Sequence, residues 1–321
     1  MNPHQKPAIS IISLVSSLAR HSSLIVQMAN REVIARYKGS MMGLLWSFLH
    51  PLLMLAVYTF IFSVVFKVKW GVEIGDGKSD FALILFAGLI MHTLLSEVLN
   101  TAHGLILSNI NYVKKVVFPL EILSVVSVVT TLFHAVVSIS ILLIALLIMD
   151  GHLYWTVFLF PIVIMPLVIL SLGFSWILAS LGVFVRDVGQ IMGIVTTVLL
   201  FLSPIFFPVS AIPEPYQIFI FLNPLTFIIE QIREVLIWGR MPNWQGLGIY
   251  TLFATVFCWI SFVWFQKTRK WLPMSSRVES VNRASAMDTV IDIKGLSKCY
   301  QIYSQPQHRL KQAFSSFFSS L

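Results

Sequence analysis

The most constraining feature of this chain is a set of long apolar segments that are almost free of charge. Residues 122–149, "ILSVVSVVTTLFHAVVSISILLIALLIM", contain no Asp, Glu, Lys or Arg. About 20 apolar helical residues cross the roughly 30 Å hydrocarbon core of a bilayer. Helices are favoured over barrel strands, because a helix satisfies its backbone hydrogen bonds within one continuous segment. The chain is therefore predicted to be an all-α integral membrane protein, in keeping with a composition that is 57% hydrophobic and 11% charged over 321 residues.

Six segments have the length and hydropathy of transmembrane helices. The fourth of them is long enough to tilt in the bilayer or to extend past its surface. The predicted spans are residues 43–66, 81–99, 122–149, 153–185, 189–207 and 246–266.

Positive charges are distributed unevenly over the flanks of these spans. When the N-terminus is placed inside, eleven Lys or Arg residues fall on cytoplasmic flanks and five on outer loops, so both termini are predicted to be cytoplasmic. The net charge of +8 is interpreted as this bias together with attraction to anionic head groups, and no nucleic acid partner is expected. The inner set is Lys6, Arg20, Arg31, Arg36, Lys38, Lys114, Lys115, Arg186, Lys267, Arg269 and Lys270, and the outer set is Lys67, Lys69, Lys78, Arg233 and Arg240.

Two segments outside the spans have the pattern of amphipathic helices. In "SSLIVQMANREVIARYK", Val26, Ala29, Val33 and Tyr37 recur at helical spacing, which predicts an interface helix that ends at residues 39–40. The loop "TAHGLILSNINYVKKVVFP" is a second, shorter amphipathic segment. A membrane loop needs no such helix unless something docks there, so a cytoplasmic partner is expected.

A proline-broken apolar run, "PIFFPVSAIPEPYQIFIFLNPLTFIIEQIREVLIWG", lies on the predicted outer side. Its two halves are too short or too polar to span, which predicts a re-entrant helical hairpin packed against protein or a water-filled cavity. Glu230, Arg233 and Glu234 follow i, i+3, i+4 spacing and can neutralise one another on one helix face. They are candidates for an outer gate, or they make the hairpin tolerable at membrane depth.

No arrangement of side chains in the sequence indicates catalysis or metal binding. His50, His92 and His134 fall inside spans and are interpreted as hydrogen-bonding residues in helix packing rather than a proton relay. Glu97 near the inner end of its span is likewise given a structural role. No phosphate-binding loop, nucleophile elbow or metal-ligand spacing is present, so the chain is not expected to be an enzyme or to hold a cofactor by itself.

Three ordered segments resemble the permease subunits of ABC exporters that move polysaccharides across the bacterial inner membrane. They are "REVIARYKGSMMGLLWSFLHPLLMLAVYTFIFSVVF", "LGVFVRDVGQIMGIVTTVLLFLSPIFFPVSAIP" and "LNPLTFIIEQIREVLIWG". The pattern is most similar to permeases for lipopolysaccharide O-antigen, with capsule and teichoic-acid exporters as near relatives. The resemblance implies an inner-membrane location, a permease homodimer, a lipid-linked polysaccharide as substrate, and an ABC ATPase partner that binds ATP and Mg.

The resemblance also assigns roles to individual residues. The first and fifth spans would line the pathway. Aromatic side chains suit this lining, because their rings stack on sugar faces without fixing one register. The implied contacts with the ATPase are Arg31, Glu32, Arg36, Tyr37, Asn109, Asn111, Tyr112, Lys114 and Lys115. The candidates for the pathway are Trp46, Tyr58, Phe60, Phe62, Phe66, Phe201, Phe206 and Phe207, each of which can equally be a helix-packing or lipid-facing residue.

The C-terminal segment "VIDIKGLSKCYQIYSQPQHRLKQAF" resembles the first strand of the ATPase subunit of the same exporters. Tyr300 stands where that family stacks adenine, whereas the phosphate-binding loop that would follow is not in the sequence. A fusion, a truncated or frame-shifted gene, and a shortened chain all explain this pattern. The expected organisation is a cytoplasmic N-terminus with its interface helix at 1–42, a permease domain at 43–270, a linker at 271–286 and an incomplete ATPase fragment at 287–321.

Two other classes of protein compete with the exporter permease. An ion-coupled secondary transporter would carry ionisable residues at mid-membrane and internal repeats, and neither is clear in the sequence. A membrane-embedded transferase acting on lipid-linked sugars would need catalytic carboxylates at an interface, for which Glu97 and Glu121 are the candidates.

Overall fold

The computed structural model describes residues 11–65, 80–109 and 118–268, and the regular structure in these ranges is entirely helical. The prediction of an all-α membrane protein is therefore confirmed. The expected linker at 271–286 and the fragment at 287–321 lie outside the described residues.

Four helices of the bundle are long and apolar enough to cross a membrane: α4 (Asp80–Ala102), α7 (Glu121–Asp150), α8 (Phe160–Phe184, preceded by a 3₁₀ turn at Trp155–Leu159) and α12 (Trp244–Thr268). Local sequence accounts for their ends. Gly151, which follows α7, has a φ of 72°, a left-handed conformation that glycine adopts without steric cost. The side chain of Asn243 accepts a hydrogen bond from the Gly246 amide at 3.0 Å and so caps the first turn of α12.

The first and fifth predicted spans form shorter helices. Helix α3 (Trp46–Thr59) continues as a π-helical segment at Phe60–Val65, so the chain stays helical close to the predicted limit at residue 66. Helix α9 (Val188–Leu202) ends before the predicted limit at residue 207. Pro204 causes this early end, because a residue before proline is pushed out of the helical region and Ser203 has a ψ of 149°. The count of six spans stays a prediction.

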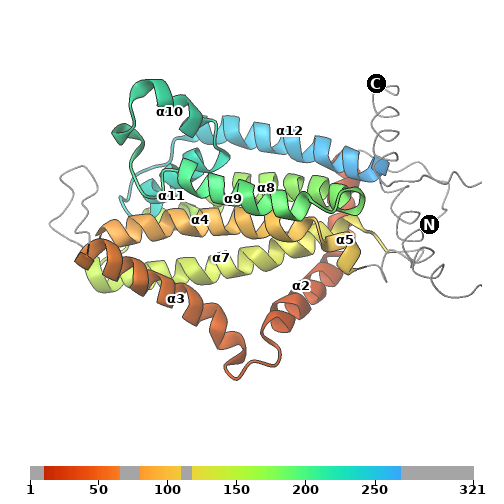
Figure 1. Cartoon of the computed structure of the whole chain (residues 1–321), viewed down its shortest axis with the longest axis horizontal. Coiled ribbons are helices and arrows are strands. Elements are labelled where there is room, and N and C mark those ends of the chain that lie inside the picture. The colour runs from red at the N-terminus through yellow and green to blue at the C-terminus, as the bar shows by residue number, and fades with distance from the viewer. Residues whose placement is uncertain (1–10, 66–79, 110–117, 269–321) are drawn as a thin grey trace, which may run out of the picture.

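Helix α4 forms the centre of the bundle. It packs against α7 on one side and against α8, α9 and α11 on the other (Figure 1). The most extensive helix pair is α8 with α12, and it depends on a glycine. A Cβ atom at Gly173 would lie 2.8 Å from Cδ1 of Phe257 and 3.0 Å from Cα of Cys258, so a small residue is needed for this close approach.

The two ends of the bundle carry different elements. Helix α5 (Leu105–Ser108) and the C-terminal end of α12 lie at one end, whereas α10 (Glu214–Phe221) and α11 (Pro224–Leu236) lie at the other (Figure 1). The N-terminal helix α1 (Ile11–Arg20) belongs to the α5 end, since Ser17 Oγ donates a hydrogen bond to Oε1 of Glu121 at the start of α7. The first and last described residues therefore share one end of the molecule.

The predicted interface helix is present as α2 (Ser22–Tyr37), but its buried face differs from the expected one. Ala29 and Val33 are buried as predicted, whereas Val26 is 64% exposed. Ile25 and Met28 complete the buried stripe instead, because α2 packs along α7 and this contact sets its rotation. The helix ends as expected, since Gly39 adopts a left-handed φ of 89°.

The proline-broken run forms α10 and α11, as the hairpin prediction requires. The side chain of Asn223 caps α11 by accepting a hydrogen bond from the Leu225 amide, and its Nδ2 donates to Ser203 Oγ at 2.8 Å. Proline follows at the first helical position, where its missing N–H costs nothing. Helix α11 then enters the core and packs against α4 and α8.

Candidate functional site

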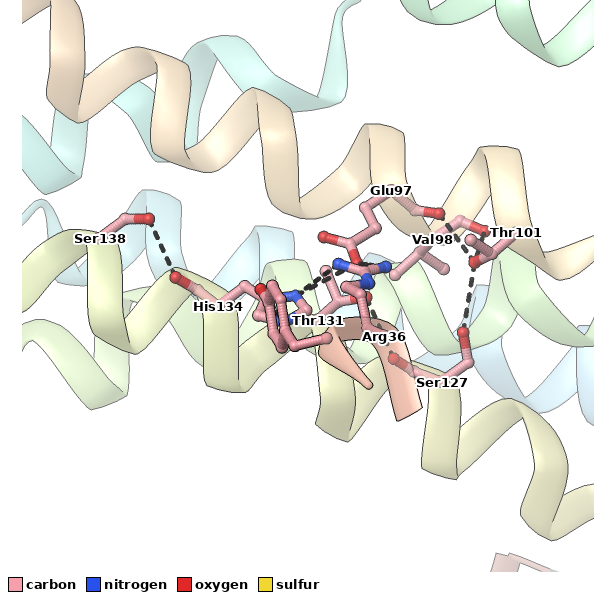
Figure 2. Close-up of polar contacts among 9 residues, drawn as sticks. Arg36, Glu97, Val98, Thr101, Ser127, Thr131, His134 and Ser138 are labelled. Atoms are coloured by element: carbon pink, nitrogen blue, oxygen red, sulfur yellow. Dashed lines mark hydrogen bonds and ion pairs between the residues drawn. The ribbon is translucent and has the colours of Figure 1, made fainter. Parts of the chain in front are cut away.

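Three helices bring charged and polar side chains together at what we call the inner cluster, formed by Arg36 of α2, Glu97 of α4 and His134 of α7 (Figure 2). Arg36 Nη2 lies 2.5 Å from Oε1 of Glu97, and Arg36 Nη1 lies 2.9 Å from Nδ1 of His134. His134 Nδ1 is also 3.3 Å from Oε1 of Glu97. One ion pair therefore joins α2 to the central helix α4 of the bundle.

The guanidinium determines the hydrogen-bond roles within the inner cluster. Arginine can only donate hydrogen bonds, so Nδ1 of His134 accepts from Nη1 of Arg36, and Nε2 is on the other side of the ring. That nitrogen faces the hydroxyl of Tyr37 at 3.4 Å. Glu97 is consequently neutralised by Arg36, and His134 positions the guanidinium as a hydrogen-bond acceptor.

Burial makes this pairing necessary. The side chains of Glu97 and His134 are 16% and 13% exposed, whereas that of Arg36 is 42% exposed. A carboxylate removed from water needs a partner, and charge-assisted hydrogen bonds to buried groups are worth about 1.5–3 kcal/mol. Burial likewise raises the pKa of Tyr37, an effect that the nearby Arg36 opposes.

The polar contact between α4 and α7 continues toward the α5 end of the bundle. The hydroxyl oxygens of Thr101 and Ser127 lie 3.3 Å apart (Figure 2), and Thr101 Oγ1 also donates to the Glu97 carbonyl at 2.8 Å. Polar pairs of this kind hold membrane helices in one register.

A cavity of about 170 Å³ adjoins the inner cluster between α3, α4 and α7. Its polar lining includes His50, Tyr58, Thr93, Glu97, His134 and Ser138. Tyr58 is thus a pathway candidate that shares this cavity with Glu97 and His134 of the inner cluster. Among residues 11–65, 80–109 and 118–268, no three His, Cys, Asp or Glu side chains group as metal ligands would.

The expected ATPase contacts divide into two groups. Arg31 and Glu32 are exposed on α2, while Arg36 belongs to the inner cluster and Tyr37 contacts it through His134. Asn109 closes helix α5, because its Nδ2 donates to the Leu105 carbonyl at 2.9 Å. Asn111, Tyr112, Lys114 and Lys115 lie outside the described residues.

Three of the six described pathway candidates are exposed, and the other three, Tyr58, Phe206 and Phe207, are half-buried. Phe60 at the end of α3 is 60% exposed and Trp46 at its start is 39% exposed. On α9, Phe201 is 62% exposed and stacks on Phe206 with ring centroids 6.1 Å apart. Phe207 is half-buried, and the side chain of Phe62, all of Phe66 and Tyr300 of the C-terminal segment lie outside the described residues.

Of the outer gate candidates, Arg233 is buried in the core with 1% exposure. Its Nε donates to the Ile84 carbonyl at 3.0 Å, Nη1 to the Pro204 carbonyl at 2.6 Å and Nη2 to the Ile205 carbonyl at 3.2 Å. Glu230 is half-buried on the same helix, and Glu234 lies 3.8 Å from Arg240. The guanidinium therefore joins the chain break after α9 to the N-terminal end of α4.

Sequence reasoning missed these long-range partners. Helical spacing links Arg233 to its neighbours on α11, whereas its three carbonyl acceptors are 28 to 149 residues away in sequence. The available signal was the proline break itself, because backbone carbonyls freed at membrane depth need donors from elsewhere. Similarly, a lone acidic residue in a span implies a cation, but the sequence does not say which one.

These elements define a polytopic α-helical membrane protein with a broken helix at one end of the bundle. The chain belongs to the ABC-2 type transporter family, whose profile matches residues 23–237. This match covers α2 through α11 and includes both the inner cluster and Arg233.

Curated relatives extend over most of the chain. It is 28% identical over 262 residues to the O-antigen export system permease protein RfbA of Myxococcus xanthus, covering 81% of this chain and 98% of the relative. It is 27% identical over 228 residues to the RfbA protein of Klebsiella pneumoniae, covering 70% and 84%. It is also 26% identical over 242 residues to the polysialic acid transport protein KpsM of Escherichia coli, covering 74% and 90%.

Replacing Arg233 with Met should destabilise the protein, because it leaves buried carbonyls without donors at a cost of about 1–3 kcal/mol. Thermal unfolding in detergent should show a lower Tm for Arg233→Met. Arg240→Met is the matched control, since Arg240 is 65% exposed and 3.8 Å from Glu234. Equal Tm values for the two variants would contradict this role for Arg233.

Replacing Glu97 with Gln should loosen α2, because Arg36 loses its charged partner. We expect faster amide hydrogen exchange over residues 25–37 of Glu97→Gln in lipid nanodiscs, and partial restoration in the Arg36→Gln, Glu97→Gln double variant. Glu214→Gln on α10 serves as the control for a change of one charge. Unchanged exchange in α2 would show that the ion pair does not hold this helix.

Proposed function

We propose that this chain is the transmembrane subunit of an ATP-driven exporter that moves a lipid-linked polysaccharide, O-antigen most closely, across the bacterial inner membrane. The observation that carries the proposal is membership of the ABC-2 type transporter family together with relatives named for O-antigen export and polysialic acid transport. The direction of transport is from the cytoplasmic to the periplasmic side.

The motor of this exporter is an ABC ATPase that binds ATP and Mg, and the present chain converts its movement into transport. Two elements at the α5 end of the bundle are suited to receive that movement. Helix α2 is joined to α4 and α7 by the inner cluster, and α5 follows α4 after a short turn. A displacement of either element is therefore passed to the central helix, because packed helices move as rigid bodies.

Two copies of the chain form the pathway. Helix α4 is enclosed by its neighbours, whereas α3 and α9 keep large apolar side chains exposed, among them Phe60 and Phe201. A polysaccharide presents C–H faces that stack on aromatic rings, and such contacts tolerate sliding because they do not fix one register. The faces of α3 and α9 from two subunits would thus line the route of the glycan.

Orientation follows from the distribution of charge. The Lys and Arg residues predicted to be cytoplasmic stand in the sequence before α3, between α4 and α7, between α8 and α9 and from residue 267 on, so the α5 end of the bundle and both termini are assigned to the cytoplasmic side. Helices α10 and α11 then face the periplasm, where Glu230, Arg233 and Glu234 border the exit of the pathway. Arg233 supports the exit through the backbone, and Glu230 and Glu234 are the groups with partial exposure.

A capsular or teichoic-acid polymer is the second candidate for the substrate. The relative named for polysialic acid transport matches nearly as much of the chain as the O-antigen permeases do. The two candidates share the motor, the dimer and the aromatic pathway and differ in the glycan.

The proposal predicts that deletion of the gene for this chain stops export while synthesis continues. Lipid-linked polysaccharide should accumulate on the cytoplasmic leaflet of the deletion strain, measured by its protection from an externally added glycan-binding lectin or antibody. The intact chain should restore surface glycan with the wild-type ATPase partner, but not with a partner whose phosphate-loop lysine is replaced. Export that continues with the disabled partner would overturn the assignment.

A further inference from the structure

His103 lies in the turn between α4 and α5 and is enclosed by two glycines from another part of the chain. A Cβ atom at Gly182, in the last turns of α8, would overlap the His103 carbonyl oxygen and lie 2.9 Å from its Cα. A Cβ atom at Gly189, in the first turn of α9, would lie 2.5 Å from Nε2 of His103 and 3.0 Å from its Cε1. Real Cβ atoms essentially never approach this closely, so the histidine fits only because both positions are glycine.

The imidazole has an unusual hydrogen-bonding state in this position. Its Nδ1 is buried and has no hydrogen-bond partner among the described residues. A buried polar atom without a partner costs about 1–3 kcal/mol. The ring is therefore held by steric fit rather than by a hydrogen bond to Nδ1. Its release from this position when the surrounding helices move would remove the cost of the unpaired nitrogen.

The contact of His103 with the two glycines joins the α4–α5 turn to α8 and α9. The turn that carries His103 connects the central helix α4 to α5, the start of the loop expected to receive the ATPase. Helix α5 packs against α8, and α8 leads directly into α9. Helix α9 carries Phe201 on its exposed face, so the contact joins the receiving loop to a helix that borders the pathway.

A second set of contacts, nearer the C-terminus of α9, holds the helix against α4. His92 Nε2 of α4 lies 2.9 Å from the Thr196 carbonyl of α9, and Asn100 Nδ2 of α4 donates to Thr196 Oγ1 at 3.4 Å. Helix α9 is thus anchored at Thr196 and contacted at Gly189 nearer its N-terminus. A displacement of α9 at Gly189 would therefore rotate the helix about its contact at Thr196.

We propose that His103 is a positioning residue that transmits movement of the α5 loop to α9 through the glycine pocket formed by Gly182 and Gly189. This inference rests on the proposed function, since it assigns the mechanical link between the ATPase-receiving loop and the pathway helix. His103 contacts neither nucleotide nor glycan and acts by its fit between α8 and α9.

The test measures nucleotide-dependent movement of α9 in the full chain reconstituted with its ATPase partner. A single cysteine at Val198, which is 48% exposed on α9, is labelled with a maleimide in a background of Cys258→Ala and Cys299→Ser. The labelling rate is compared without nucleotide and with ATP, Mg and vanadate. His103→Ala and Gly189→Ala should abolish the nucleotide-dependent change in rate, while the partner still co-purifies and hydrolyses ATP.

A matched substitution on the same helix separates this effect from a general change in α9. A Cβ atom at Gly193 has no neighbour within 4 Å, so Gly193→Ala should keep the nucleotide-dependent change. The His103→Ala, Gly189→Ala double variant should behave as His103→Ala does, because the overlap with the ring is gone. Loss of ATP hydrolysis and labelling response in parallel with a fall in folded protein would mean a structural role and would overturn the proposal.

The remaining outcomes are distinguishable. A wild-type response that persists unchanged in His103→Ala overturns the link while leaving the exporter assignment intact. If the intact chain neither binds an ABC ATPase nor responds to nucleotide, the proposed function fails, and the inference fails with it.

Discussion

The architecture depends on one constraint, which is that backbone polar groups freed at membrane depth must find donors inside the protein. The chain breaks after α9 because Pro204 prevents the helix from continuing, and the carbonyls of Pro204 and Ile205 are left without helical partners. Arg233 supplies both of them with donors and adds a third bond to Ile84 at the N-terminal end of α4. The hairpin of α10 and α11 can therefore fold back into the bundle.

Helix α4 connects the hydrogen bonds of Arg233 to the inner cluster. Near its N-terminal end the Ile84 carbonyl accepts from Arg233, and near its C-terminal end Glu97 pairs with Arg36. The two arginines come from opposite parts of the sequence and from opposite ends of the molecule. Helix α4 is thus the element through which α2 and the hairpin of α10 and α11 are joined.

The arrangement divides the protein into a rigid interior and helices that are available to other molecules. Helices α4, α8 and α11 are packed among their neighbours, while α3 and α9 keep exposed aromatic residues such as Phe60 and Phe201. In the proposed exporter the packed interior would transmit force, and the exposed faces would meet the glycan and a second subunit. The contact of His103 with Gly189 lies at the boundary between these two parts.

The sequence by itself determined the helical membrane class, most helix boundaries and the family, because these depend on apolar length, on local signals such as Gly39 and Gly151, and on ordered motifs. Only the tertiary structure decided which cation pairs with Glu97, which carbonyls Arg233 serves, and that Ile25 and Met28 rather than Val26 face α7. Helical periodicity reports on residues three or four apart, whereas these contacts join residues tens of positions apart. Pairing over such distances depends on how helices rotate and pack, and the apolar pattern of a membrane helix leaves that rotation open.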